Sequence, residues 1–225
     1  REAELRPQAL SIRDGLRIRT APKYPLRGHQ LGYRETANSY DAWDLDQYEQ
    51  YIRDLIIFGT NAVELITSLD PDYVDGKVMK RTQWDMNVDL TKLLDRYGLD
   101  VWFWMPLEGD VRVPEEAQRE LEARERFFAQ CADIDHIMVP GGDPGHTHPA
   151  DLMPWLERMA QVLHARFPHA GLWVSNQKFK GEESESFYRY IEEKRPDWLK
   201  GVVYGPSSPG TVEENRKRIP PEYML

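Results

Sequence analysis

The regular alternation of short apolar runs with amphipathic segments constrains this chain more than any other feature. The runs are rich in Val, Ile, Leu and Trp, and the segments between them place apolar residues on one helical face. Continuous apolar runs are typical of strands buried on both faces, as in a parallel sheet covered by helices. The sequence therefore predicts six strands, at residues 26–33, 61–66, 100–105, 135–139, 171–174 and 199–204.

Helix start and stop signals lie between these strands. Either Asp41 or Asp44 is suited to cap the first helix, because a short acidic side chain accepts hydrogen bonds from free backbone N–H groups. Gly59 and Gly98 follow the first two helices, and Pro114 opens the third. The sequence predicts helices at 45–58, 87–97, 114–131, 149–167, 182–194 and 212–218.

Strand-helix units repeated along a chain are typical of a (β/α)8 barrel of the TIM type, an α/β fold. Such a barrel has eight strands and typically about 250 residues. Six units are counted here, and the final PPEYML shows no closing strand. We expect residues 26–225 to form most of a catalytic-type barrel within a longer protein. Residues 1–25 are expected to be a linker or the tail of an upstream element, with a strand or hairpin in ALSIRDGLRIRTAP.

An open, doubly wound sheet is the alternative fold. Such sheets commonly bind phosphate at a glycine-rich turn between the first strand and its helix. The first strand here lies in RGHQLGYR, where the glycine spacing differs and no helix follows directly. The barrel is therefore the preferred fold.

Composition limits the partners. The chain has 225 residues, 40% of them hydrophobic, which is enough for one sizeable core. Its formal net charge of −9 argues against nucleic acid or an anionic membrane as partner, and no apolar run approaches the roughly 18 residues of a membrane span. The single cysteine, Cys131, excludes an internal disulfide and fits cytoplasm and periplasm alike. The oligomeric state stays open.

A polar loop follows the fourth predicted strand. The apolar run before Pro140 stops at Gly141 and Gly142, and Asp143 comes next. Glycine lets the backbone turn sharply and come close to a ligand. Because ligands bind at the carboxyl ends of strands in βα-repeat proteins, we expect Asp143 in the active site.

Other carboxylates follow neighbouring strands. Glycoside cleavage needs two of them, one to protonate the leaving oxygen and one to attack or to activate water. Glu108 and Asp110, after the third strand, are the predicted catalytic partners of Asp143. Glu64 lies within the second strand, where pairing with a basic neighbour such as Arg27 is the preferred interpretation.

Aromatic residues are frequent, with seven Trp and eleven Tyr. Aromatic faces at strand ends are suited to stacking on sugar rings, although the same residues would also suit a sheet core. The predicted substrate-binding residues combine these rings with groups that hold hydroxyls: His29, Tyr33, Trp104, Trp173, Asn176 and Tyr204.

Two histidines in GHTHP raise a metal alternative. His146 and His148, two residues apart on an extended segment, are able to chelate one ion together with Asp143. Barrel metallohydrolases of the amidohydrolase type carry such a pair on the first strand, where this chain has only His29. We therefore expect no metal and no cofactor.

Three segments resemble β-N-acetylhexosaminidases and related glycoside hydrolases. DGLRIRTAPKYPLRGHQLGYR resembles the start of their barrel, and the resemblance implies that Arg27 contacts the sugar. IRDLIIFGTNAVEL is similar to their first helix and second strand, which an asparagine opens, as Asn61 does here. HIMVPGGDPG resembles their His-x-Gly-Gly-Asp-Glu loop after the fourth strand, in which the aspartate orients the substrate and the glutamate is the general acid.

Asp143 matches that aspartate, but Pro144 stands at the position of the acid and has no proton to donate. The layout, over about residues 14 to 205, also resembles α-glucuronidase barrels, whose sugar carboxylate needs a basic partner such as Arg27, Arg34 or Lys178. The resemblance implies a glycosidase, an O-glycosyl hydrolase of polysaccharide degradation, with a carbohydrate ligand. Two alternatives stay open: a carbohydrate-binding barrel without catalysis, and a metal-dependent hydrolase that uses His146 and His148.

Overall fold

The computed structural model describes residues 3–6, 9–12, 14–34 and 42–225. Its strands are β1 (Ala3–Arg6), β2 (Ala9–Ile12), β3 (Gly28–Leu31), β4 (Ala62–Ile66), β5 (Asp100–Trp104), β6 (His136–Pro140), β7 (Gly171–Ser175) and β8 (Leu199–Val203). Its helices are α1 (Leu45–Ile57), α2 (Gln83–Arg96), α3 (Pro114–Phe128), α4 (Pro149–Arg166), α5 (Glu182–Lys194) and α6 (Val212–Arg218).

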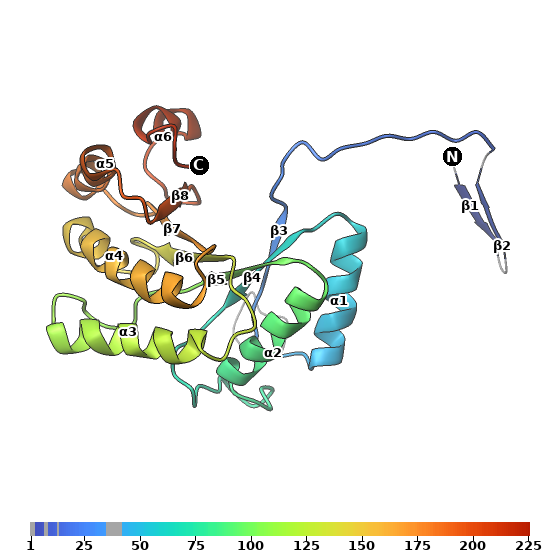
Figure 1. Cartoon of the computed structure of the whole chain (residues 1–225), viewed down its shortest axis with the longest axis horizontal. Helices are drawn as coiled ribbons and strands as arrows, with labels where there is room; N and C mark the ends of the chain where they lie inside the picture. Colours follow the sequence, from blue (N-terminus) through green and yellow to red (C-terminus); the bar gives the residue numbers. More distant parts are fainter. Residues whose placement is uncertain (1–2, 7–8, 13, 35–41) are drawn as a thin grey trace.

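One parallel sheet organises the chain. Its strand order is β3-β4-β5-β6-β7-β8, so each strand pairs with the next one along the sequence. In Figure 1 the helices α1 to α5 follow one another along the outer side of this sheet. A doubly wound sheet would reverse its strand order and carry helices on both faces. The fold is therefore an α/β fold of the TIM-barrel type with six strand-helix units, and the doubly wound alternative is wrong.

β3 and β8 are the two edges of the sheet. Beyond α6, Met224 forms a parallel bridge with Gly201 of β8. The Met224 carbonyl accepts a hydrogen bond from the Val202 N–H at 2.9 Å, and the Met224 N–H donates to the Lys200 carbonyl at 3.2 Å. The final residues thus begin a further pairing beside β8, which the sequence pattern of PPEYML did not reveal.

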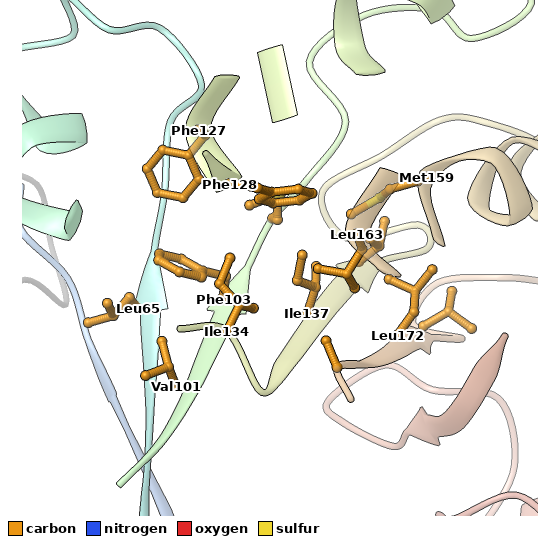
Figure 2. Close-up of a cluster of buried hydrophobic side chains, with 14 of the residues drawn as sticks. Leu65, Val101, Phe103, Phe127, Phe128, Ile134, Ile137, Met159, Leu163 and Leu172 are labelled. Atoms are coloured by element: carbon orange, nitrogen blue, oxygen red, sulfur yellow. The ribbon is translucent and has the colours of Figure 1, made fainter. Parts of the chain in front are cut away.

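The larger core lies between the outer face of the sheet and the helices. Figure 2 shows Phe127 of α3 near Phe103 of β5, and Leu163 of α4 near Leu172 of β7. All four side chains are fully buried, and the rings of Phe103 and Phe127 meet edge to face at 5.2 Å. Full burial of such a side chain stabilises a fold by about 1.5–3 kcal/mol. Alternate residues of each strand point toward the helices, so packing against the helices accounts for every second residue of each apolar run.

The helix starts follow local capping chemistry. Asp44 caps α1, because its side chain accepts from Gln47 N while the Gln47 side chain accepts from Asp44 N; the alternative cap, Asp41, lies outside the described residues. α2 begins one turn earlier than the sequence predicts, because the Thr82 hydroxyl accepts from Asp85 N. α3 ends at Phe128, three residues before the predicted end.

The amino-terminal prediction is partly wrong. The hairpin consists of residues 3–6 and 9–12, whereas the alternating stretch around Leu16 and Ile18 has no strand. A strand needs a neighbour that pairs with its backbone, and the structure provides none for this stretch within the described residues. The division of the chain at residue 25 stays a prediction. Of the described helices, none is both long enough and apolar enough to cross a bilayer.

Candidate functional site

Two glycines hold the loop after β6 against the end of β7 and the loop that follows it. Gly141 N donates to Ser175 Oγ at 3.2 Å, and Gly142 N donates to the Gln177 carbonyl at 3.1 Å. A Cβ atom at Gly141 would lie 2.3 Å from the Ser175 carbonyl oxygen, and one at Gly142 would lie 2.6 Å from the Gln177 carbonyl oxygen. The sequence prediction was that these glycines allow a ligand to approach closely. In the structure, the group that approaches them is the backbone at the end of β7 and in the loop after it.

This contact brings Asp143 to a lysine. The Lys178 Nζ lies 2.9 Å from Asp143 Oδ1. Lys178 has a φ of +61°, in the left-handed region, as the chain leaves β7. The side chains are 40% exposed at Asp143 and 53% exposed at Lys178, so both groups remain accessible to a ligand in water.

A cavity of about 480 Å³ lies at this pair and is called here the β6–β7 cavity. It is lined by residues 142–147 of the first loop and by Lys178, Phe179, Lys180 and Glu183. Glu183 was not singled out from the sequence. The signal was its place in the acidic first turn of α5, directly after the loop that follows β7. Two carboxylates, from Asp143 and Glu183, therefore share one cavity.

The two predicted partners of Asp143 do not line this cavity. Glu108 lines a separate cavity of about 340 Å³, together with Glu116 and Glu120 of α3. Asp110 accepts hydrogen bonds from the Arg112 guanidinium at 2.7 and 2.8 Å, which lowers the pKa of Asp110 from 3.8 to about 2. The structure thus separates these carboxylates from the cavity that contains Asp143.

The two histidines of GHTHP take different roles. His146 lines the β6–β7 cavity. His148 caps α4, because its Nδ1 accepts from Ala150 N at 3.1 Å, and its Nε2 lies 2.6 Å from Glu182 Oε2. Among the described residues, the group with ligand atoms close enough for one metal ion is a different one, Asp133, Asp135 and His169.

Arg27 lies at the amino end of β3, opposite the strand ends that carry Asp143. Its Nε donates to the Gly59 carbonyl at 2.6 Å, and its NH1 donates to the carbonyls of Tyr24 and Pro25 at 2.8 Å. Its backbone N–H donates to Asn61 Oδ1 at 2.8 Å. These contacts favour a structural role for Arg27. They also leave Glu64 with another partner, Gln30.

Three further predicted binding residues contact helices or the loop before α2. The His29 Nε2 lies 3.2 Å from the Tyr51 hydroxyl of α1. Tyr33 is 2% exposed, and its hydroxyl accepts from Lys80 N at 3.1 Å. Asn176 is fully buried and donates from Nδ2 to Asn215 Oδ1 at 2.6 Å. These contacts favour structural roles, because they use groups that a sugar hydroxyl would need.

The remaining predicted binding residues are aromatic, and they lie in two parts of the structure. Trp173 is buried on the inner face of the sheet in a cluster with Trp102 and Met138, and Trp104 packs against this cluster. Tyr204 follows β8 and is 37% exposed, and its hydroxyl donates to the Gly210 carbonyl at 3.0 Å. The stacking of Trp104 and Tyr204 on a sugar stays a prediction.

Register aligns four inner-face residues across neighbouring strands: Gln30, Glu64, Trp102 and His136. Gln30 Nε2 donates to Glu64 Oε2 at 2.7 Å. Burial raises the pKa of Glu64 above 4.5, although the Gln30 hydrogen bond opposes this shift. The Trp102 and His136 rings lie 4.2 Å apart between centroids.

His136 was not singled out from the sequence. Its Nδ1 accepts from Trp173 Nε1 at 3.0 Å. Burial, with a smaller contribution from the charge of Lys200, lowers the pKa of His136 from 6.5 to about 4. Strand alternation was the sequence signal that could have identified it. In an alternating strand, His136 and Met138 share the inner face while Ile137 faces the helices.

No protein-family model and no curated protein matches the chain. Solved structures do match its fold. An endoxylanase of family GH10 from a sugarcane soil metagenome aligns with a TM-score of 0.53 and 12% identity, over 85% of this chain and 61% of that one. The exo-β-1,4-mannosidase Op5Man5 from Opitutaceae bacterium strain TAV5 aligns with a TM-score of 0.51 and 14% identity, over 71% of this chain and 33% of that one.

An α-amylase from Geobacillus thermoleovorans, solved with acarbose, aligns with a TM-score of 0.50 and 12% identity, over 71% of this chain and 45% of that one. At this level of sequence identity, the three structures resemble the chain in fold alone. The chain spans between 33% and 61% of the length of the three enzymes. All three are named as enzymes that act on carbohydrates.

Proposed function

We propose that this domain binds and hydrolyses a carbohydrate in the β6–β7 cavity, as a glycoside hydrolase-like barrel. The observation that carries the proposal is the Asp143–Lys178 pair, 2.9 Å apart at the carboxyl ends of two neighbouring strands. A fixed carboxylate and an ammonium together accept from and donate to sugar hydroxyls. The strand-end position supports this assignment, because that is where TIM-type barrels bind their ligands.

The two carboxylates of the cavity have different proposed roles in catalysis. Asp143 Oδ1 lies 2.9 Å from the ammonium of Lys178, which suits the carboxylate that attacks or activates water. Glu183 is the proposed acid that protonates the leaving oxygen. Asp143 thus keeps the central role that the sequence predicts, and Glu183 replaces Glu108 and Asp110 as its proposed partner.

The resemblance to β-N-acetylhexosaminidases supports the proposal that this domain binds a carbohydrate. It gives less support to the proposal that the domain uses their catalytic mechanism. Asp143 occupies the position of the aspartate that orients the substrate in that family. Pro144 occupies the position of the acid, so this chain needs an acid from elsewhere in the cavity. If Glu183 does not supply it, the domain is a carbohydrate-binding barrel without catalysis, which is the second candidate function.

The test combines hydrolysis with binding. Aryl glycosides that include a glucuronide and an N-acetylglucosaminide are assayed with and without EDTA, and binding of the matching free sugars is followed by thermal shift. A ligand present at a hundredfold excess over its Kd stabilises the fold by about 2.7 kcal/mol. Asp143→Asn and Glu183→Gln are expected to reduce kcat by about a hundredfold or more.

Glu182→Gln is the matched control. Glu182 neighbours Glu183 in α5 but is paired with His148, so its removal should leave turnover unchanged. Unchanged turnover in Asp143→Asn would contradict the proposal. Sugar binding without turnover in the unmodified protein would favour the non-catalytic barrel, and turnover abolished by EDTA would favour the metal-dependent alternative.

A further inference from the structure

Three side chains of types that bind metal ions lie together at the amino ends of β6 and β7. Asp133 and Asp135 belong to the segment between α3 and β6, and His169 belongs to the segment between α4 and β7. One ligand atom of each side chain lies within 4.8 Å of the other two. None of the three lines the β6–β7 cavity, which lies at the opposite ends of the same strands. The cluster is therefore separate from the proposed hydrolase site.

The spacing of these atoms matches a coordination shell. His169 Nε2 lies 3.1 Å from Asp133 Oδ1 and 3.8 Å from Asp135 Oδ1. In tetrahedral sites zinc lies about 2.0–2.2 Å from imidazole nitrogens and carboxylate oxygens, which places neighbouring ligand atoms roughly 3.4 Å apart. Both distances from His169 lie within about half an ångström of that spacing.

Hydrogen bonds from the surrounding backbone hold both carboxylates in place. Asp135 Oδ2 accepts from Val101 N at 2.7 Å, which leaves Oδ1 as the atom nearest to the imidazole. The Asp135 carbonyl accepts from Gly171 N at 2.7 Å, and Asp133 Oδ1 accepts from Ile134 N at 2.8 Å. Carboxylates that ligate metal ions typically have such additional hydrogen bonds, which orient them toward the ion.

An ordinary ion pair accounts for only part of this cluster. The contact of 3.1 Å between His169 and Asp133 fits a hydrogen bond, whereas the 3.8 Å to Asp135 is too long for one. In the described part of the chain, no lysine or arginine forms an ion pair with either aspartate. Two neighbouring carboxylates thus have a single basic partner. A divalent cation would contact all three groups at once and neutralise both carboxylates.

The ligand types select the ion. Calcium and magnesium prefer shells of oxygen ligands, so an imidazole does not suit them. Soft thiolate and thioether ligands, which select Cu(I), are not part of the cluster. Zinc binds both imidazole nitrogen and carboxylate oxygen, often with three protein ligands and a water.

We infer that Asp133, Asp135 and His169 form a binding site for one Zn²⁺ ion. The ion joins the segment before β6 to the segment before β7 and stabilises the scaffold. Its place at the amino ends of the strands agrees with this role, because that face of a TIM-type barrel serves stability. The site is independent of hydrolysis in the β6–β7 cavity.

The test is isothermal titration of ZnCl₂ into the protein after EDTA treatment and dialysis, with CaCl₂ titrated in parallel. His169→Asn removes the imidazole, and the fold should tolerate this change because the side chain is 53% exposed. Asp133→Asn removes one charge but keeps an acceptor for Ile134 N. His148→Asn is the matched control, because His148 also lies beside a carboxylate, with 2.6 Å between its Nε2 and Glu182 Oε2.

We expect one Zn²⁺ per chain. His169→Asn and Asp133→Asn should each raise the Kd by about tenfold or more, and His148→Asn should leave it unchanged. Zinc should also raise the Tm of the unmodified protein, because it binds the folded state, and should have much less effect on His169→Asn.

Three results would overturn the inference: no zinc binding, a Kd that His169→Asn leaves unchanged, or binding that His148→Asn abolishes, which would place the ion in the GHTHP segment. Calcium binding as tight as zinc binding would overturn it too, because the acidic surface would then attract cations in general. No sugar enters these titrations, so failure here is separate from failure of the proposed hydrolase.

Discussion

The ammonium of Lys178 and the carboxylate of Asp143 meet at 2.9 Å across the ends of two neighbouring strands, β6 and β7. The two residues are 35 positions apart in the sequence. Their meeting depends on the backbone hydrogen bond from Gly142 to Gln177. The pair is therefore a product of strand pairing, and it defines the polar end of the proposed binding cavity.

Lys178→Met is expected to leave the fold almost intact. Both partners are about half exposed, and exposed ion pairs contribute between about 0 and 1 kcal/mol. Urea denaturation should show a free energy of unfolding within about 1 kcal/mol of the unmodified protein, while carbohydrate binding weakens. A loss of several kcal/mol would mean that the pair has a structural role instead.

Gly141→Ala should destabilise the fold strongly. The added Cβ would lie 2.3 Å from the Ser175 carbonyl oxygen, so the two strand ends must separate and weaken their hydrogen bonds. We expect a loss of about 2 kcal/mol or more in the free energy of unfolding. Gly28→Ala is the control, because its Cβ meets only ordinary contacts. Equal stability of the two variants in urea denaturation would contradict this explanation.

The pair of Arg124 and Glu120 within α3 is buried, with side chains 0% and 9% exposed. Arg124 also donates to the Pro106 carbonyl at 2.9 Å, and Glu120 accepts from Gly109 N at 2.7 Å. Glu120→Leu should cost about 3–5 kcal/mol, because it leaves a buried charge without its partner. The double variant Glu120→Leu with Arg124→Met should lose much less, as a thermodynamic double-mutant cycle would measure. Additive losses would exclude this account.

His136 should make stability depend on pH. Its pKa falls from 6.5 to about 4 on folding, chiefly because of burial. The unfolded chain therefore binds more protons than the folded one in this window, so stability is fully present above about pH 6.5 and falls as the pH drops toward 4. After allowance for partial exposure, we expect a loss of about 1–2 kcal/mol.

His136→Asn removes this titration and keeps an acceptor for Trp173 Nε1. Urea denaturation at several pH values should show a smaller loss between pH 6.5 and 4 in the variant than in the unmodified protein. NMR titration of the His136 imidazole provides the direct check, and a pKa near the ordinary value would contradict the prediction.

The element order was readable from the sequence because it depends on local chemistry. Continuous apolar strands, the Asp44 cap and Pro114 at a helix start each act within a few residues. Where a local signal was overlooked, as with Thr82 at the start of α2, the boundary moved by one turn. Alternation alone failed around Ile18, because a strand also needs a partner.

The site was harder to predict, since it depends on which residues meet. The sequence by itself determined a succession of strands and helices, and it placed Asp143 after a buried strand. Only the tertiary structure decided that Lys178 and Glu183 share its cavity and that Glu108 and Asp110 lie outside it. The physical reason is register: side chains alternate between the two faces of a strand, so a residue's surroundings are fixed only once distant strands have paired.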